Sequence, residues 1–320
     1  MNYFIFIFLQ LLSFLNLSVF CYELCTYGAY DRYQKLITQY PDHKDKFTIL
    51  SKIPLPIWVT DRDPNAFNNV KTALEKCENL INILIVYALP NKDCKSGFSS
   101  SGSNKNNQDY QSYINKLKTI VDNKEVIYII EPDAIGLSID HQCGQDYPGN
   151  IKNAINILSE NINAKIYLDI GYWSLIYNED QIKKVINLIN QIDPNQKING
   201  ITLNLSNYRS NNEMIFACNR FKQMSGKKYN CIIDTSRNWN GPSSDNQWCN
   251  LITAGIGELP IKNPAESIDY YLWLKPQYEL DGPCIGFSNS YQINKNAGDF
   301  DLTYLVKLWN NGNSILKKCN

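Results

Sequence analysis

The sequence of 320 residues has very little histidine and no net charge. His43 and His141 are its only histidines, which argues against a histidine-centred catalytic triad or a histidine-rich zinc site. The 31 Lys and Arg residues balance the 31 Asp and Glu residues, so no net field attracts nucleic acid or anionic lipid. Only 19% of residues are charged and 44% are hydrophobic, which excludes wholesale disorder. We therefore expect no metal, no cofactor and no nucleic-acid partner, and a chemistry that uses other side chains.

Long apolar runs are missing everywhere except at the N-terminus, where residues 1–20 read MNYFIFIFLQLLSFLNLSVF. This run predicts a secretory signal peptide over residues 1–21, followed by one domain over residues 22–320. A membrane anchor is the alternative, because the run lacks Lys and Arg. Ten cysteines in a secreted chain favour disulfides over zinc. We expect an extracellular protein that is free of the membrane after cleavage, and cleavage after Cys21 would leave one of nine cysteines unpaired.

Short apolar runs alternate with longer amphipathic stretches in the rest of the chain. This alternation predicts a parallel sheet with connecting helices, and no linker or repeat divides it, so one α/β barrel-like domain fits best. The expected strands are Leu55–Val59, Ile81–Leu89, Val126–Ile130, Lys165–Ile170, Gly200–Leu205, Asn230–Ile233 and Tyr270–Leu274. The expected helices are Asn65–Asn79, Gln108–Val121, Asn150–Asn161, Asp180–Ile192, Glu213–Met224 and Phe300–Asn310.

Polar and charged residues follow each expected strand. In a parallel barrel these carboxyl ends lie on one face, which is where α/β barrels place their active sites. Any single Asp or Asn there is explained equally well by helix capping or a turn, but six such ends together indicate a site. The residues concerned are Asp61, Asp63, Asp93, Glu131, Asp133, Asp169, Asn204, Asn207, Asp234, Arg237, Lys275, Glu279 and Asp281.

Several carboxylates without histidine favour acid/base chemistry on a neutral substrate, and glycoside hydrolysis is the leading case. That reaction needs one carboxyl group to protonate the leaving oxygen and a second carboxylate to activate water or attack the sugar. Tryptophans offer flat apolar faces for sugar rings, and Trp248 is the best candidate. The residues therefore indicate a glycosidase, with a non-catalytic secreted glucan-binding or wall protein as the alternative.

Seven segments resemble motifs of glycoside hydrolase family 6, the cellulases that include cellobiohydrolase II and related endoglucanases. Residues 86–94 (VYALPNKDC) resemble V-Y-D-L-P-x-R-D-C, and residues 130–135 (IEPDAI) resemble I-E-P-D-S-L. Weaker matches are residues 167–171 (YLDIG), 204–208 (NLSNY), 234–238 (DTSRN), 248–250 (WCN) and 273–282 (WLKPQYELDG). The resemblance spans most of the chain and implies a distorted barrel of seven parallel strands in a monomer that hydrolyses β-1,4-glucan with inversion.

The resemblance also implies residue roles. Asp133 is then the general acid, Asp93 the carboxylate that keeps its proton in place, and Asp281 the base. Lys92 and Arg237 are expected to hold Asp93 ionised. Tyr87 is expected to press on the sugar at the cleavage point. The implied substrate-binding residues are Trp58, Asp169, Asn204, Asn207, Arg237, Trp248, Lys275 and Glu279, and the implied disulfides join Cys94 with Cys143 and Cys249 with Cys284.

The chain departs from the family pattern at four places. Ala88 replaces an Asp, Lys92 an Arg and Tyr172 a His, and the nearest Trp to a displaced one is Trp173. Only two residues separate Asp281 from Cys284, which predicts an open cleft and endo action, with a cellobiohydrolase as the alternative. Asn204-Leu205-Ser206 is a glycosylation sequon that we expect to stay unmodified, because a glycan there would obstruct the cleft.

Overall fold

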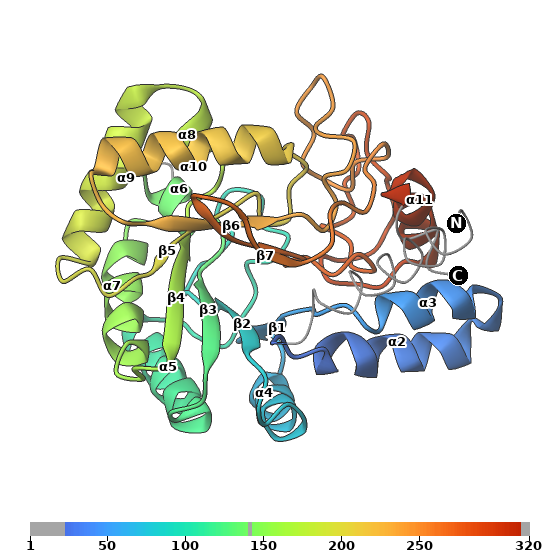
Figure 1. Ribbon diagram of the computed structural model, residues 1–320, viewed down its shortest axis with the longest axis horizontal. Coiled ribbons are helices and arrows are strands. Elements are labelled where there is room, and N and C mark those ends of the chain that lie inside the picture. Colours follow the sequence, from blue (N-terminus) through green and yellow to red (C-terminus); the bar gives the residue numbers. More distant parts are fainter. Residues whose placement is uncertain (1–22, 140–142, 315–320) are drawn as a thin grey trace, which may run out of the picture.

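The computed structural model describes residues 23–139 and 143–314 and is built on a curled sheet of eight strands (Figure 1). The strand order is β1-β2-β3-β4-β5-β6-β8-β7, with every neighbouring pair parallel except β8 and β7. The strands are β1 (Ile57–Thr60), β2 (Asn82–Tyr87), β3 (Val126–Ile130), β4 (Ala164–Asp169), β5 (Gly200–Leu203), β6 (Asn230–Asp234), β7 (Ile261–Ala265) and β8 (Ile268–Leu272). The seven expected parallel strands are all present, and one antiparallel strand adds to them.

Strands β2, β3 and β5 are buried on both faces along their whole length, as their continuous apolar sequences predict. Along β2, Ile83 and Ile85 face the inside of the curl, whereas Leu84 and Val86 pack against the helices outside. The Nε1–H of Trp58 in β1 donates to the carbonyl oxygen of Leu274, just after β8, at 3.0 Å. This bond joins β1 to the chain beyond β8, across the gap that the sheet leaves open.

Helices cover the outer face of the sheet, and the helices nearest the two ends of the described chain lie together on one side of it (Figure 1). They are α2 (Tyr27–Gln39), the 3-10 turn η1 (Pro41–His43), α3 (Lys44–Leu50), α4 (Ala66–Lys76), α5 (Asn107–Val121), α6 (Ala134–Ile139), α7 (Tyr147–Leu158), α8 (Trp173–Ile176), α9 (Glu179–Ile192), α10 (Asn211–Ser225) and α11 (Leu302–Asn311). Helix α9 shows why they dock, since Ile182, Val185, Ile189 and Ile192 recur at helical spacing and are buried.

A separate hydrophobic core holds α2, α3 and α11 together with the loops that follow β6 and β8. Tyr33 of α2 packs edge-on against Tyr278, with ring centroids 5.5 Å apart, and Leu308 of α11 is fully buried in the same cluster. Because these loops contain few regular elements, this second core and the disulfide between Cys249 and Cys284 fix their course. The loops carry part of the site described below.

Four disulfides link the described residues. Cys94 pairs with Cys143 and Cys249 with Cys284, the two pairs implied by the family resemblance. Cys218 of α10 pairs with Cys231 of β6, and Cys25 pairs with Cys77, tying the segment before α2 to the end of α4. The expected signal peptide and the cysteines at positions 21 and 319 lie outside the described residues. Within the described ranges, no helix has the length and apolar character that a membrane crossing requires.

Candidate active site

The carboxyl ends of the parallel strands open into a cleft of about 1090 Å³. Tyr87 ends β2, Asp133 comes three residues after β3, and Lys275 comes three residues after β8. Nine of the twelve residues expected to act on or bind the substrate line this cleft: Trp58, Tyr87, Asp93, Asp133, Asn207, Trp248, Lys275, Glu279 and Asp281. The parallel topology thus brings together side chains that are far apart in the sequence.

Three of the expected substrate-binding residues lie behind the wall of the cleft. Asp169, Asn204 and Arg237 have exposed fractions of 1%, 1% and 0%. Each holds another part of the site: Asp169 accepts a hydrogen bond from the backbone of Asp133, Asn204 braces two neighbouring segments, and Arg237 pairs with Asp281. These three side chains therefore support residues of the cleft and its walls from behind.

Asp133 is a half-buried carboxyl group directly before α6. Burial raises its pKa from 3.8 to about 7, and the charges of Asp93 and Asp281 add to the rise. Its backbone N–H donates to Oδ2 of Asp169 at 2.7 Å, and its φ of 68° lies in the left-handed region that Asp tolerates better than most residues. The backbone therefore fixes the position of a carboxyl group that carries its proton in mildly acidic solution.

Asp93 sits on the loop after β2 with both carboxylate oxygens engaged. The hydroxyl of Ser96 donates to Oδ1, and the backbone N–H of Ser99 donates to Oδ2 at 2.6 Å. The expectation that Lys92 and Arg237 hold Asp93 ionised is wrong. Among the described residues, Lys92 pairs with Asp61 and Arg237 pairs with Asp281. The two cations lie on different loops, after β2 and after β6, and each loop directs its cation to a carboxylate other than Asp93. Neutral donors hold the Asp93 carboxylate instead.

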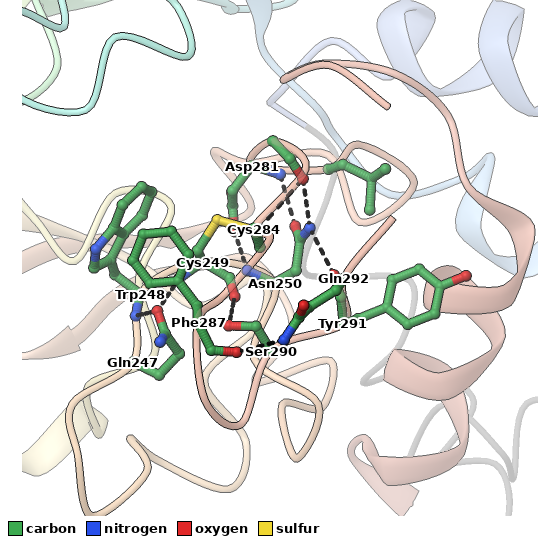
Figure 2. Close-up of a disulfide and its surroundings, with 12 residues drawn as sticks. Gln247, Trp248, Cys249, Asn250, Asp281, Cys284, Phe287, Ser290, Tyr291 and Gln292 are labelled. Carbon is green, nitrogen blue, oxygen red and sulfur yellow. Dashed lines mark hydrogen bonds between the residues drawn. A yellow bond between two sulfur atoms is a disulfide. The ribbon is translucent and has the colours of Figure 1, made fainter. Parts of the chain in front are cut away.

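Asp281 accepts several hydrogen bonds, and Figure 2 shows it beside one of its partners, Asn250. Its Oδ2 accepts from Tyr208 Oη at 3.0 Å, from Arg237 Nη1 at 3.0 Å and from the backbone N–H of Asn250 at 2.9 Å. Its own N–H donates back to Oδ1 of Asn250 at 2.7 Å. Asp281 Oδ1 faces Lys275, whose Nζ is 4.0 Å away. One oxygen of the carboxylate is thus fully used, and the other stays available on the cleft side.

The disulfide between Cys249 and Cys284 brackets this network, as Figure 2 shows. Asn250 follows one cysteine, and its Nδ2 donates to the carbonyl oxygens of Gly282 at 2.8 Å and Tyr291 at 3.2 Å. The crosslink and the amide side chain together tie the loop of Asp281 to the loop of Trp248. This keeps the carboxylate and the exposed indole in one rigid unit.

Arg237 supplies the positive charge behind Asp281. Its guanidinium is completely buried, lies 4.7 Å from the ring centroid of Tyr208 and donates to the carbonyl oxygen of Ser206 through Nη2. Asp281 and Tyr208 raise the pKa of Arg237, so this group stays charged despite its burial. A buried guanidinium of this kind stabilises an ionised carboxylate beside it.

Lys92 and Asp61 form a buried ion pair that braces the Asp93 loop. Lys92 Nζ lies 2.5 Å from Asp61 Oδ1 and also donates to the carbonyl oxygen of Ser101 at 2.8 Å. Asp61 Oδ2 accepts from the backbone N–H of Asn104 at 2.8 Å. A side chain at Gly102 would collide with the Asp61 carboxylate, since its Cβ would lie 2.1 Å from Oδ2. The loop can close on Asp61 only because position 102 is glycine.

Glu131 is a second fully buried carboxyl group, and it holds the end of β2. Its oxygens accept from the backbone N–H groups of Ala88 at 3.1 Å and Leu89 at 3.3 Å and from Tyr110 Oη at 2.9 Å. Burial raises its pKa to about 8, although these hydrogen bonds oppose the rise. Glu131 therefore fixes the strand end that presents Tyr87.

Aromatic side chains form two parts of the cleft wall. Tyr87 meets Trp58 edge-on, with ring centroids 5.7 Å apart, and Lys275 Nζ lies 5.9 Å from the Trp58 ring centroid. Trp248 is 36% exposed and packs against Phe98, with ring centroids 6.0 Å apart. Because Phe98 belongs to the Asp93 loop, this second contact joins the loops of Asp93 and Trp248.

Asn204 is buried and fully hydrogen-bonded. Its Nδ2 donates to the carbonyl oxygens of Asp234 at 2.8 Å and Arg209 at 3.1 Å, and its Oδ1 accepts from the Arg209 N–H at 2.9 Å. A glycan on Nδ2 would break both donor bonds. Asn204 is thus inaccessible to glycosylation because its side chain is packed behind the cleft wall, not because it points into the cleft.

The residues that the structure describes contain no group of three or more His, Cys, Asp or Glu side chains arranged to hold a metal ion. The carboxylates of the cleft make hydrogen bonds with hydroxyl, amide and guanidinium donors instead.

The family model of glycosyl hydrolases family 6 matches residues 25–312, which is nearly all of the described chain. The chain belongs to glycosyl hydrolases family 6. Endoglucanase A of Thermobispora bispora is 26% identical over 245 residues, covering 74% of this chain and 52% of that protein. Endoglucanase-6B of Humicola insolens is 30% identical over 258 residues, covering 68% of this chain and 73% of that protein.

Solved structures of family 6 share the fold. A family 6 enzyme of Orpinomyces sp. Y102 superposes with a TM-score of 0.77 at 26% identity, covering 91% of this chain and 97% of that one. The endoglucanase Cel6 of Mycobacterium tuberculosis gives 0.72 at 25% identity, covering 83% and 89%. The chain spans 52% of the Thermobispora bispora enzyme and 43% of Endoglucanase A of Cellulomonas fimi, about half the length of these curated relatives.

The sequence of this family 6 chain placed Asp61 and Glu131 among the acidic residues that follow the strands, but it indicated no role for them. Both are buried and hold the loops around Asp93 and Tyr87. It did not name Tyr208 as a partner of Asp281 or Phe98 as a neighbour of Trp248. A weak signal existed for Asp61, since Lys92 stands where the family has Arg and a buried cation requires an anion.

Proposed function

We propose that this chain hydrolyses β-1,4-glucosidic bonds in cellulose or related β-glucans. The observation that carries the proposal is Asp133, a half-buried acid with a pKa raised to about 7 that shares one cleft with Asp93 and Asp281. Family 6 membership supports it, as does the Mycobacterium tuberculosis endoglucanase, whose structure holds a thio-linked cello-oligosaccharide, methyl-cellobiosyl-4-deoxy-4-thio-β-D-cellobioside.

In the proposed reaction Asp133 protonates the oxygen that leaves the sugar. A pKa of about 7 keeps its proton available at mildly acidic pH, and this is what a general acid requires. The bond between the anomeric carbon and that oxygen breaks as a water molecule attacks from the opposite face, so the product has inverted configuration. An acid and a base about 6.5 to 9.5 Å apart leave room for this water in inverting enzymes.

Asp281 is the base in this proposal, and its free Oδ1 receives the proton of the attacking water. Three donors occupy Oδ2, so Oδ1 is the oxygen left for the water. Asp93 is a poorer base because Ser96 and Ser99 occupy both of its oxygens. Its contribution is its charge, which helps Asp133 to retain the proton. Tyr87 and Trp58 then form the apolar wall against the sugar at the cleavage point.

Endo action is supported by the short connection from Asp281 to Cys284, which leaves no long loop at that point to cover the cleft. One contact favours the second candidate, an exo-acting cellobiohydrolase. Phe98 packs on Trp248, and a Cβ at Gly282 would lie 2.6 Å from the Phe98 ring, so the Asp93 loop touches both loops across from it. This contact narrows the cleft on the Trp248 side.

Viscosity and reducing ends distinguish the two candidates. Endo action lowers the viscosity of soluble carboxymethylcellulose early, while few reducing ends have formed, whereas exo action releases cellobiose with little change in viscosity. The same viscosity assay compares Phe98→Ala with the control variant Phe287→Ala. Both rings touch Trp248, but only Phe98 belongs to the Asp93 loop that narrows the cleft. Unchanged viscosity together with cellobiose release would contradict the endo proposal.

Proton NMR of the first product formed shows whether its reducing end is the α or the β anomer. A β product would contradict inversion.

We further propose that the protein is secreted as a monomer without a cofactor and is free of the membrane after signal cleavage. The four disulfides support secretion, because they form and persist in oxidising compartments. Sequencing the N-terminus of the protein from culture medium, together with light scattering, tests both points. A protein that keeps residues 1–21 and sediments with membranes would contradict this proposal.

A further inference from the structure

The catalytic cleft does not end at Trp58 and Lys275. The same cavity continues past these residues to the first turns of α2 and α4, where its walls include Tyr27, Arg32 and Asn69. Figure 1 shows the start of α2 beside β1 and near α4. None of these residues belongs to the motifs that indicated the site. The cavity is therefore longer than the catalytic carboxylates and their aromatic neighbours require.

A continuous series of contacts leads along one wall from the centre to α2. Lys275 Nζ lies near the Trp58 ring and 3.6 Å from Glu279 Oε2. The neighbouring Tyr278 carries the Arg32 guanidinium above its ring, 5.9 Å from the centroid. A guanidinium stacked on tyrosine offers donors to sugar hydroxyls and is held in place by the ring.

Arg62, on the loop after β1, adds a second guanidinium to the lining of this cavity. Arg62 as a residue is half-buried and lines the cavity, and among the described residues its guanidinium makes neither an ion pair nor a side-chain hydrogen bond. Its Nη2 would lie 3.8 Å from a Cβ at Gly298, so it reaches towards the loop that follows Glu279. Its donors are therefore open to the hydroxyl oxygens of a ligand in the cavity.

Helix α2 is held rigidly against the barrel, as a binding wall should be. The disulfide between Cys25 and Cys77 ties its start to the end of α4. Gly28 permits close packing, because a Cβ there would lie 3.2 Å from the carbonyl oxygen of Leu55. The positions of Tyr27 and Arg32 are thus fixed relative to the catalytic centre.

We propose that Tyr27, Arg32 and Arg62 form an additional glucan-binding site that holds sugar rings of the same chain beyond Trp58. The Tyr27 ring supplies an apolar face, and the two guanidinium groups supply donors to hydroxyl oxygens. The site selects longer substrates, because only they extend from Asp133 to α2. This inference rests on the proposed glucanase function and specifies its substrate length.

The test compares kcat/KM on cello-oligosaccharides from cellotriose to cellohexaose for the full chain and its variants. Tyr27→Ala and Arg32→Ala should each lower kcat/KM on the longest ligand by about tenfold, the loss that one good contact carries, and leave cellotriose unchanged. Tyr30→Ala is the matched control, since Tyr30 is on the same helix, 54% exposed and not part of the cavity lining. Equal losses at every length, or no loss at any length, would overturn the proposal.

Calorimetry separates this inference from the proposed function. In the Asp133→Asn background, cellohexaose should bind about tenfold more weakly when Tyr27 or Arg32 is replaced by alanine. That result together with an inactive parent protein would refute hydrolysis but keep the binding site. An active parent whose variants bind cellohexaose as tightly as the Asp133→Asn protein does would refute the site alone.

Discussion

Replacing Asp93 by asparagine removes one of the two carboxylate charges that, after burial, raise the pKa of Asp133. The burial of Asp133 remains, so its pKa should fall below about 7 but stay above the ordinary 3.8. A nearby charge moves a carboxyl pKa by about one unit or more. We therefore expect the pKa of Asp133 to be lower in Asp93→Asn than in the unaltered protein, by about one unit.

This change has a defined effect on the amount of protonated acid. At pH 7, about half of the Asp133 carboxyl groups carry a proton in the unaltered protein, compared with about one in eleven in the variant. At pH 4 nearly all carry one in both proteins. The activity ratio of variant to unaltered protein should therefore fall about fivefold between pH 4 and pH 7.

The assay is kcat/KM on a soluble β-1,4-glucan over this pH range, because kcat/KM reports the free enzyme. The ratio cancels any loss at all pH values that comes from disturbing Ser96 and Ser99. Asp63→Asn is the control, since Asp63 also lines the cleft but does not contribute to the raised pKa of Asp133. A constant ratio from pH 4 to pH 7, or an alkaline limb far above pH 7 in the unaltered protein, would refute the reasoning.

Three further predictions concern stability and modification. Glu131 has a pKa of about 8 in the folded protein and an ordinary pKa of 4.5, so the stability that its protonated form contributes at low pH is lost as the pH rises from 4.5 to 8. Glu131→Gln should therefore show a shallower fall of Tm between pH 4.5 and pH 8. An unchanged slope of Tm against pH would contradict this. Replacing both Cys94 and Cys143 by alanine should lower the unfolding free energy by about 2 to 4 kcal/mol in denaturant titrations, and an unchanged midpoint would contradict this. Intact-mass analysis of protein from a eukaryotic secretory host should find Asn204 unmodified, because its Nδ2 donates two internal hydrogen bonds, and a glycan there would disprove its packing.

The parallel strands were predictable because their apolar residues form short runs between amphipathic stretches. Strand β7 was missed because Pro264 and the exposed or half-exposed residues around it resemble a loop, and it lies at the sheet edge, where proline is tolerated. Helix α2 was missed because Ala29, Tyr33 and Leu36 form its buried face. Small and aromatic residues at helical spacing give a weaker pattern than the Ile and Val of α9.

The convergence of Asp93, Asp133 and Asp281 on one cleft was predictable because each follows a strand, and strand ends in a parallel barrel meet on one face. The pairing of charges was not predictable in the same way. Arg237 and Asp281 are 44 residues apart, and Lys92 and Asp61 are 31 apart, so their contacts depend on loop conformations that strand order leaves open. Residue type and strand position indicated side chains that line the cleft, whereas the partners of these side chains required the structure.

We propose that Asp133 delivers the proton to the leaving oxygen, and substrates with different leaving groups test this role most directly. A dinitrophenyl cellobioside needs little protonation to depart, whereas cellohexaose needs a proton. Asp133→Ala should lose about 100-fold to 10,000-fold in kcat/KM on cellohexaose, the usual contribution of general acid catalysis, and remain close to the unaltered protein on the dinitrophenyl substrate. Equal losses on both substrates, or full activity on cellohexaose, would contradict Asp133 as the acid.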